Sequence, residues 1–357
     1  MEHLFGTQIV IPEGLATDGG LRGAEDDAAH EFFHQWNIKR IRPEALGPWN
    51  YEAQNPTPSL WVGEGFTQYY GDITMERAGL ESADEYLQGL GASLGNSLHA
   101  PAYALMSAED SSLTAWFHDA TPLRQETNTG ITTISYYARG EQLAAVLDLD
   151  IRRRTHGRKS LDDAMRWLWS NTYHAPRATY YLPGRGYTDT DVRHALEAAA
   201  GGASYAQFFA DYVSGTKPIP YDDYLQAVGL KLQCEVPAGA ASYSGLFLAG
   251  NLVRGVAPGS PAEAAGFGAD DLIQSVNGAA LPPPVPFQGR GLGGHGGNPF
   301  IGGLPPHQAA AIVVSQHGQT RTLSLTPGAP QASVCRLVDL PEVSADQRAL
   351  RAAWLGR

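Results

Sequence analysis

The chain has 357 residues, which is long enough for two domains and a sizeable hydrophobic core. Its formal net charge of −12 argues against a nucleic-acid partner, because phosphate binding needs clustered lysines and arginines. No apolar run is long enough to span a bilayer, and the N-terminal sequence MEHLFGTQ lacks the basic and apolar regions of a signal peptide. We therefore expect a soluble protein of the cytoplasm or the periplasm, and the sequence does not separate these two compartments.

The first predicted elements are a short strand, from Thr7 to Ile11, and a glycine-rich loop. Glu25-Asp26-Asp27 then places negative charge where a helix is expected to begin, which favours the helix dipole. This helix should end between Ile38 and Arg42, because a residue that precedes a proline disfavours helical backbone.

The segment His30-Glu31-Phe32-Phe33-His34 on this helix has the form H-E-x-x-H. Residues four apart share a helix face, so His30 and His34 can offer two imidazole nitrogens to one metal ion. Zinc accepts histidine nitrogens, and a catalytic zinc keeps one coordination position for water. Glu31 beside that water can take its proton. The alternative interpretation is an ordinary helix with two histidines facing solvent.

A second helix is predicted from Leu60 through Arg77, and Glu64 lies in its first turn. A glutamate at this distance from H-E-x-x-H is the usual third ligand of one zinc-peptidase superfamily, the gluzincins. By itself Glu64 would be a favourable charge at a helix N-terminus. Together with H-E-x-x-H, the pattern favours a metal ligand, and the proline-rich loop 43–59 turns the chain back so that Glu64 can reach the ion.

The pattern from about residue 72 to 225 is mainly helical. Ser82 and Glu85 have the spacing of a capping box. Residues 141–154 carry apolar side chains near helical spacing and predict a core helix, and further helices are expected over 161–169 and 189–200.

Short strands and turns predominate after residue 225. The runs SPAEAAG at 260–266 and DDLIQSVNG at 270–278 resemble a PDZ domain, and Asn277-Gly278 is a hairpin-turn signal. A PDZ groove binds an extended peptide as an added strand, although such a domain can also merely pack on a catalytic domain. The Pro- and Gly-rich residues 282–306 contain a formal G-x-G-x-x-G at 289–294, but they lack the flanking strand and helix of a nucleotide site. We predict a flexible insertion here.

The two cysteines, Cys234 and Cys335, lie outside these motifs. They are compatible with one disulfide or with two free thiols.

The segments HEFFHQWNIKRIRP at 30–43 and LWVGEGFTQYY at 60–70 resemble the glycyl aminopeptidase family of zinc metallopeptidases. A third match, ISYYARG at 134–140, has Arg139 where the family usually has lysine. Together with the change of composition near residue 225, the resemblance implies an α+β multidomain protein. Its predicted parts are a mainly helical, thermolysin-like catalytic domain over 1–225, a small β-rich PDZ domain over 226–330 with the insertion 282–306, and a tail over 331–357 that forms a short helix.

The resemblance also implies the roles of the site residues. One Zn²⁺ per chain is held by His30, His34 and Glu64, and Glu31 is the general base. Tyr137, three residues before Gly140, stabilises the oxyanion, and the adjacent Tyr136 is the alternative. Thr67 and Gln68 are candidates for fixing the histidine tautomers.

The implied reaction is release of small N-terminal residues, Gly or Ala, from a peptide substrate. Such a substrate needs an acidic partner for its free amine, and the family's edge-strand motif assigns this role to Glu2. Family members carry a β-rich domain before the catalytic one, and we expect this chain to begin at the end of that domain. Two alternatives remain: a PDZ-containing peptide-binding protein with a zinc site and little turnover, and an endopeptidase.

Overall fold

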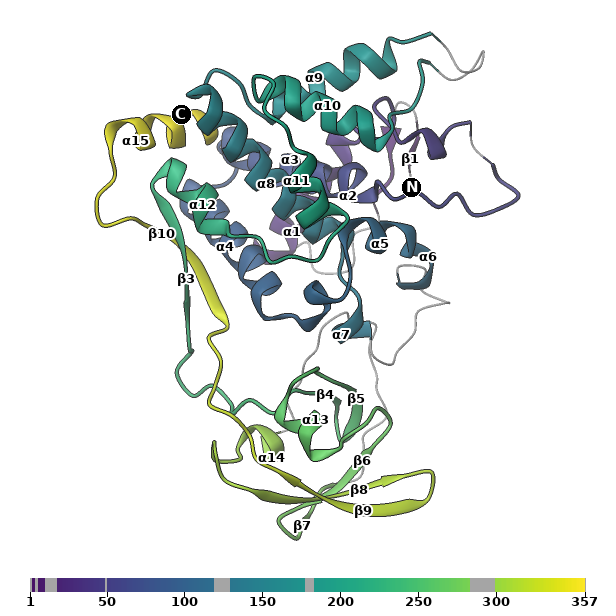
Figure 1. The fold of residues 1–357 in the computed structure, drawn as a ribbon, viewed down its shortest axis with the longest axis vertical. Helices are drawn as coiled ribbons and strands as arrows, with labels where there is room; N and C mark the ends of the chain where they lie inside the picture. The colour runs from purple at the N-terminus through teal and green to yellow at the C-terminus, as the bar shows by residue number, and fades with distance from the viewer. Residues whose placement is uncertain are drawn as a thin grey trace.

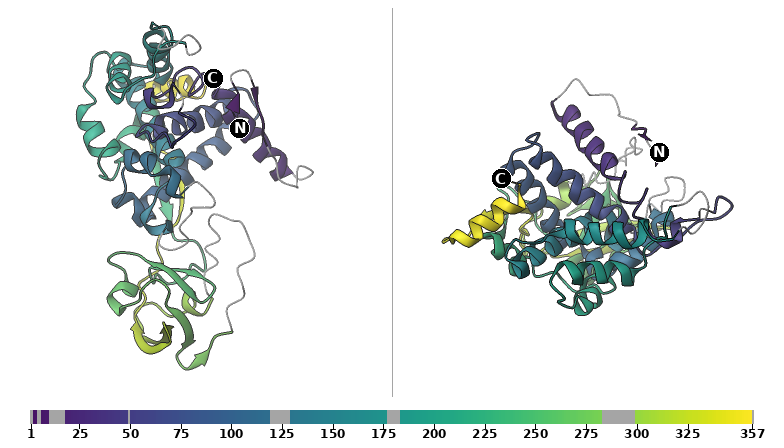
Figure 2. Two further views of the ribbon diagram at one scale, coloured as in Figure 1. Left: turned by 90° about the vertical axis from the view of Figure 1, so that its right-hand side faces the viewer. Right: turned by 90° about the horizontal axis from the view of Figure 1, so that it is seen from above.

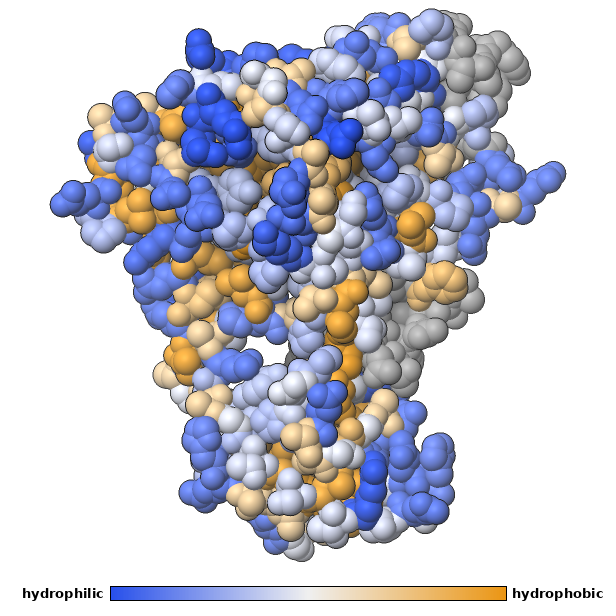
Figure 3. Space-filling model, in the orientation of Figure 1, coloured by the Kyte–Doolittle hydropathy of each residue, from blue (hydrophilic) through white to orange (hydrophobic). Residues whose placement is uncertain are grey.

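The computed structural model describes residues 2–3, 6–9, 18–48, 50–118, 129–176, 183–282 and 299–356. A mainly helical unit and a smaller β-rich unit lie at opposite ends of the molecule, joined by a long two-stranded ribbon (Figures 1 and 2). The predicted α+β class is thereby confirmed. None of the described helices is both long and apolar enough to cross a membrane. Hydrophilic side chains cover most of the face shown in Figure 3, with apolar side chains scattered among them.

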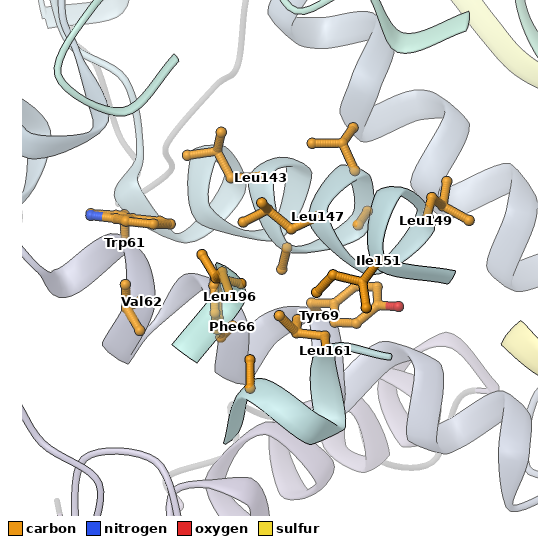
Figure 4. Close-up of a cluster of buried hydrophobic side chains, with 14 of the residues drawn as sticks. Trp61, Val62, Phe66, Tyr69, Leu143, Leu147, Leu149, Ile151, Leu161 and Leu196 are labelled. Carbon is orange, nitrogen blue, oxygen red and sulfur yellow. The ribbon is translucent and has the colours of Figure 1, made fainter. Parts of the chain in front are cut away.

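Helix α8 (Tyr136–Thr155) is the central element of the helical unit and is buried along most of its length. Figure 4 shows its apolar side chains among those of neighbouring helices; the labelled residues are Trp61, Val62, Phe66, Tyr69, Leu143, Leu147, Leu149, Ile151, Leu161 and Leu196. The core helix predicted over 141–154 is therefore confirmed.

Helix α1 (Asp18–Phe33) begins before the acidic residues predicted at its start and ends well before the predicted end near Ile38. After α1 the chain turns, and Ile38 has a left-handed φ of 81°. The Ile38 amide donates to the Ile41 carbonyl across this turn. A right-handed helix cannot continue through such a residue, which rules out the predicted end between Ile38 and Arg42. Helix α1 itself ends at Phe33, so His34 is the first residue beyond it. It stays one turn from His30, because its amide still donates to the His30 carbonyl at 3.3 Å.

The helix predicted over 60–77 is divided at Glu64 into α2 (Leu60–Gly63) and α3 (Gly65–Arg77). Helix α3 crosses α8 at two glycines, and a Cβ on Gly65 would lie only 2.2 Å from the Cα of Gly140. No larger residue fits this crossing. The contact brings the beginning of α3, next to Glu64, close to the first turn of α8.

The remaining helices of this unit surround α8 and the ribbon. They are α4 (Ala83–His99), α5 (Ala108–Leu113), α6 (Ala115–His118), α7 (Thr129–Thr132), α9 (Leu161–Leu168), α10 (Asp189–Ala199), α11 (Ala206–Phe208), α12 (Tyr221–Leu225) and α15 (Ala345–Trp354), with 3-10 turns at Glu44–Leu46, Pro101–Ala104 and Gln226–Val228 and π turns at Trp169–Tyr173 and Phe209–Val213. The predicted capping box is present at α4, where the Glu85 amide donates to Ser82 Oγ and the Ser82 amide donates to the Glu85 carboxylate. The predicted C-terminal helix is α15.

Strands β3 (Leu230–Glu235) and β10 (Val334–Asp339) form the antiparallel ribbon. Cys234 and Cys335 lie opposite each other in its register and form a disulfide, which decides between the two alternatives left open above. The ribbon and α15 pack on the helical unit through Leu230, Leu232, Leu337, Leu350 and Trp354. Parts of the chain on both sides of the β-rich unit therefore belong to the helical core.

The β-rich unit, called the β unit below, has a core of its own, which includes Val253, Ile273, Ile312, Val314 and Leu325. Its sheet has the order β4-β5-β6-β8-β9, with β7 paired to β6. The elements are β4 (Leu246–Ala249), β5 (Leu252–Val256), α13 (Pro261–Ala265), β6 (Leu272–Val276), β7 (Ala279–Ala280), α14 (Pro299–Gly302), β8 (Ala310–Gln316) and β9 (Gln319–Leu325). The predicted hairpin turn lies between β6 and β7, where Asn277 and Gly278 both have positive φ. The formal G-x-G-x-x-G at 289–294 lies outside the described residues.

Candidate active site

Three predicted metal ligands converge where α1, α3 and the first turn of α8 meet. The Nε2 atoms of His30 and His34 lie 3.0 Å apart. Oε2 of Glu64 lies 3.3 Å from the first of these nitrogens and 3.1 Å from the second. Helix α3 passes α1 closely at this point, because a Cβ on Gly71 would lie 3.1 Å from the backbone nitrogen of His30. Backbone packing thus brings together side chains that are 34 residues apart in sequence.

The donor set fits a divalent metal ion. Nδ1 of His34 lies 3.0 Å from the carbonyl oxygen of Asn37. A carbonyl oxygen only accepts, so Nδ1 donates here, and Nε2 on the side of Glu64 is the nitrogen that a metal ion would take in place of its hydrogen bond with the carboxylate. Two imidazole nitrogens and one carboxylate oxygen within 3.3 Å of one another are donors that zinc accepts, and a cation between them would offset their mutual repulsion.

Glu64 is held in its ionised form. Burial opposes ionisation, but hydrogen bonds with His30 and His34 outweigh it and lower the pKa of Glu64 to about 2. The carboxylate is therefore negative at neutral pH, as a metal ligand must be.

Glu31 lies beside this cluster, with its carboxylate within 4.8 Å of ring nitrogens of His30 and His34. The hydroxyl of Thr7 donates to Glu31 Oε2 at 3.0 Å. Thr7 belongs to β2 (Gly6–Thr7), which pairs with β1 (Glu2–His3), and Glu2 stands opposite Thr7 in the register. The backbone of Glu2 is thus near the site, while its side chain lies outside what the structure describes.

Tyr137 lines a pocket of about 240 Å³ together with Asp26, Asp27, His30, Glu31 and Gln68. Its ring centroid lies 5.8 Å from that of His30. Tyr136 is buried and stacks on Tyr137 at 4.8 Å, on the side of the core. Of the two adjacent tyrosines, Tyr137 is therefore the one that lines the pocket.

Asn37 is a site residue that the sequence reasoning missed. Its fully buried side chain donates to the carbonyl oxygens of Val62 (2.8 Å) and Gly63 (3.0 Å) and to Thr67 Oγ1 (3.1 Å). Thr67 Oγ1 in turn lies 3.4 Å from His34 Nδ1. One amide therefore ties the turn after α1 to the turn that carries Glu64. The signal in the sequence was a polar residue between the apolar Trp36 and Ile38.

The other predicted partner, Gln68, donates to Asp72 Oδ1 at 2.8 Å. Burial raises the pKa of Asp72 to about 7, against the effect of the Gln68 hydrogen bond. Asp26 and Asp27 line the pocket itself and give it acidic surroundings that the sequence does not announce.

The family comparison agrees with this geometry. Residues 26–143 match the family of M61 glycyl aminopeptidases. The matched segment contains His30, Glu31, His34, Glu64 and Tyr137. The chain is therefore similar to these peptidases over the part that forms the site.

Among solved structures, an aminopeptidase N family protein from Idiomarina loihiensis superposes with a TM-score of 0.73 at 23% sequence identity. The superposition covers 96% of this chain and 56% of that protein, so the chain spans little more than half of its length. At this identity the likeness concerns the fold. A serine endoprotease from Yersinia pestis matches 26% of this chain and 30% of its own at 19% identity, with a TM-score of 0.20, too low to carry an argument. No curated protein matches the chain. The chain is thus similar to M61 glycyl aminopeptidases over residues 26–143, and the solved structure adds a likeness of fold.

Proposed function

We propose that this chain is a zinc-dependent aminopeptidase that releases small N-terminal residues, Gly or Ala, from peptides. The convergence of His30, His34 and Glu64 is the observation that carries the proposal. Their donor atoms form a three-ligand set that leaves room for water and substrate, as catalytic zinc sites require.

Zinc in this site would lower the pKa of a bound water and polarise the substrate carbonyl. Glu31 then takes the proton of the water and passes it to the leaving amine. The hydroxyl of Thr7 donates to one carboxylate oxygen and keeps the other available for this transfer. Tyr137, on the pocket wall, donates its phenolic hydrogen to the carbonyl oxygen as negative charge develops there.

The pocket also supports the choice of substrate. Asp26, Asp27 and Glu31 make its lining acidic, which attracts the positive amine of a peptide N-terminus. We assign Glu2 as the residue that holds this amine, since its strand pairs with the one that contacts Glu31.

We propose that the β unit, from β4 to β9 within the predicted range 226–330, is a PDZ domain that binds an extended peptide; β3, in the same range, packs on the helical unit instead. Strand β4 supports this assignment, because it stands at one end of the strand order of the described sheet, the position at which an extended peptide adds a strand. If the chain binds zinc and peptides but turns over no substrate, the peptide-binding interpretation replaces the enzymatic one.

The deciding experiment measures zinc content and hydrolysis of Gly- and Ala-aminoacyl reporters by the purified chain. We expect about one zinc per chain and release of single residues. Glu64→Ala should lose most of the zinc, whereas Glu31→Gln should keep it and lose nearly all turnover. Full zinc in Glu64→Ala would remove that residue from the site, and internal cuts in a protein substrate would identify an endopeptidase.

The same assay separates the two tyrosines. Removing one oxyanion donor typically lowers kcat by about a hundred- to a thousand-fold. Tyr137→Phe should therefore lower kcat by that order with little change in KM, and Tyr136→Phe should have a smaller effect. The opposite ranking would assign the donor to Tyr136.

A further inference from the structure

We propose that the reduced chain has a second metal site, formed by Cys234, Cys335 and His99, which binds one thiophilic divalent cation such as zinc. The site lies on the β3–β10 ribbon and the end of α4, separate from the candidate active site. It does not depend on the proposed peptidase activity.

The three donor atoms are already close together. Nε2 of His99 lies 3.8 Å from Sγ of Cys335, and the donor atoms of His99, Cys234 and Cys335 all lie within 4.8 Å of one another. Zinc–sulfur and zinc–nitrogen bonds of about 2.3 Å and 2.0 Å at a tetrahedral angle hold the two donors about 3.5 Å apart. His99 thus stands at nearly the distance from Cys335 that two ligands of one zinc ion require.

The position of His99 follows from close packing of α4 on the ribbon. A Cβ on Gly95 would lie 2.3 Å from Cβ and 2.5 Å from Sγ of Cys335, so only glycine lets the helix approach this strand. Residues four apart share a helix face, and His99 therefore follows Gly95 onto the face that meets the sulfur. His99 also lies in the last turn of α4, where the helix dipole favours a cation.

The burial of the three residues suits a small ion that enters from solvent. Cys335 is buried, Cys234 is half-buried and His99 is exposed. No fourth His, Cys, Asp or Glu joins the group within the described part of the chain. Three protein donors would leave one position for water, and the exposed side near His99 gives that water access.

The chemistry requires a reductant. A dithiol reduces the Cys234–Cys335 bond by two electrons and two protons, and is itself oxidised to a disulfide. Two thiols result. Metal binding then releases both thiol protons, because the thiolate is the ligand.

The ribbon leads into and out of the β unit, and the sequence separation of the two cysteines is 101. In the oxidised chain the disulfide joins β3 and β10 next to the last cross-strand pair of the ribbon, Glu235 and Val334. In the reduced chain the metal would join the same two sulfurs. The ribbon would therefore remain cross-linked under oxidising and reducing conditions alike.

The test uses Co²⁺ as the probe, because thiolate ligands give cobalt a charge-transfer absorption that histidine and carboxylate ligands do not. The full chain is reduced with a phosphine, its fold is checked by circular dichroism, and Co²⁺ is titrated. With the His30, His34 and Glu64 site filled with zinc before reduction, we expect the absorption to saturate at one cobalt per chain, to be absent from the oxidised chain, and to disappear when more zinc is added.

Two variants distinguish a built site from chance binding by thiols. His99→Ala leaves both cysteines in place and should weaken Co²⁺ binding at least about tenfold, since even loss of a group that supports a ligand costs 10–100-fold. His194→Ala, at an exposed histidine of α10, should have no effect. The proposal is overturned if the reduced chain shows no thiolate–cobalt absorption, if His99→Ala binds as tightly as the unmodified chain, or if reduction alone unfolds the protein.

Discussion

Asn37 shows how a single buried amide can hold a site in which it takes no direct part. Its side chain reaches two carbonyl oxygens and one hydroxyl on the segment that carries Glu64, while its own carbonyl oxygen accepts from His34. Both contacts affect ligands: one sets the position of the carboxylate, and the other sets the tautomer of the imidazole.

We predict that Asn37→Ala lowers zinc affinity by about 10–100-fold, the usual effect of losing a group that orients ligands. It should also lower the free energy of unfolding by about 1–3 kcal/mol, because buried carbonyl groups lose their donor. Chelator competition measures the first quantity and urea unfolding the second. Asn171→Ala is the matched control, since the exposed Asn171 makes one bond to the Trp167 carbonyl. Unchanged zinc affinity in Asn37→Ala would limit this residue to a structural role.

Glu141 is a buried acid on the core side of α8, where it accepts a hydrogen bond from Ser93 at 2.6 Å. Burial, with a smaller contribution from the charge of Asp72, raises the pKa of Glu141 from its ordinary 4.5 to about 8. The folded chain therefore keeps this proton over a pH range in which the unfolded chain has lost it. As the pH rises from about 4.5 to about 8, the unfolded state is increasingly favoured.

We predict that Glu141→Gln removes this pH-dependent loss of stability. The free energy of unfolding of the variant, minus that of the unmodified chain, should be larger at about pH 8 than at about pH 5. One pKa unit corresponds to about 1.4 kcal/mol, which sets the upper slope per pH unit. Urea unfolding at both pH values checks the difference, with Glu52→Gln as an exposed control. A difference that does not change with pH would contradict the raised pKa.

At the scale of elements, the crossing of α3 and α8 positions the site. Gly65 and Gly140 let the two backbones touch, and the first residues of both helices reach the pocket because of it. Local sequence signals explain why each segment is helical, but they do not predict that Gly65 and Gly140 are in contact. The glycines matter here for their lack of a side chain and not for their backbone freedom.

We predict that Gly140→Ala destabilises the chain by about 1–3 kcal/mol or more, the usual range for overpacked sites. The added Cβ would lie 2.1 Å from the Trp61 carbonyl oxygen and 2.6 Å from the Gly65 Cα, and backbone cannot move aside cheaply. Gly89→Ala is the matched control, because a Cβ there meets nothing within 4 Å on α4. That control should gain roughly 0.5–1 kcal/mol from higher helix propensity. If both changes shifted the thermal unfolding temperature equally, the close backbone contact between α3 and α8 at Gly140 would be contradicted.

At the scale of the whole molecule, the β unit is inserted into a helical unit that is completed by the C-terminus. Trp354 on α15 is fully buried, and its Nε1 donates to the hydroxyl of Tyr69 on α3 at 2.9 Å. The ribbon before α15 packs on α4. The last segment of the chain is thus part of the core around the site.

We predict that the β unit can be removed without unfolding the helical unit. Glu235 and Val334 are cross-strand partners, so residues 236–333 can be replaced by Asn-Gly in a two-residue hairpin turn. The shortened chain should keep its helical circular dichroism and bind one zinc. Removal of residues 344–357 is the contrasting variant. It should unfold the chain, because it removes Trp354 and exposes the core side chains that Trp354 covers. Loss of helical structure in the shortened chain would show that the two units depend on each other.

The sequence by itself determined the residue types of the candidate site and most of the helices. Both depend on short-range rules: H-E-x-x-H places two histidines on one helix face, and capping and periodicity act within a few residues. Only the tertiary structure decided where α1 ends, that Asn37 joins the two ligand segments, that the second of two adjacent tyrosines faces the pocket, and that Cys234 lies opposite Cys335. Each of these depends on packing between segments far apart in the chain, and such packing leaves no periodic signal in either segment alone.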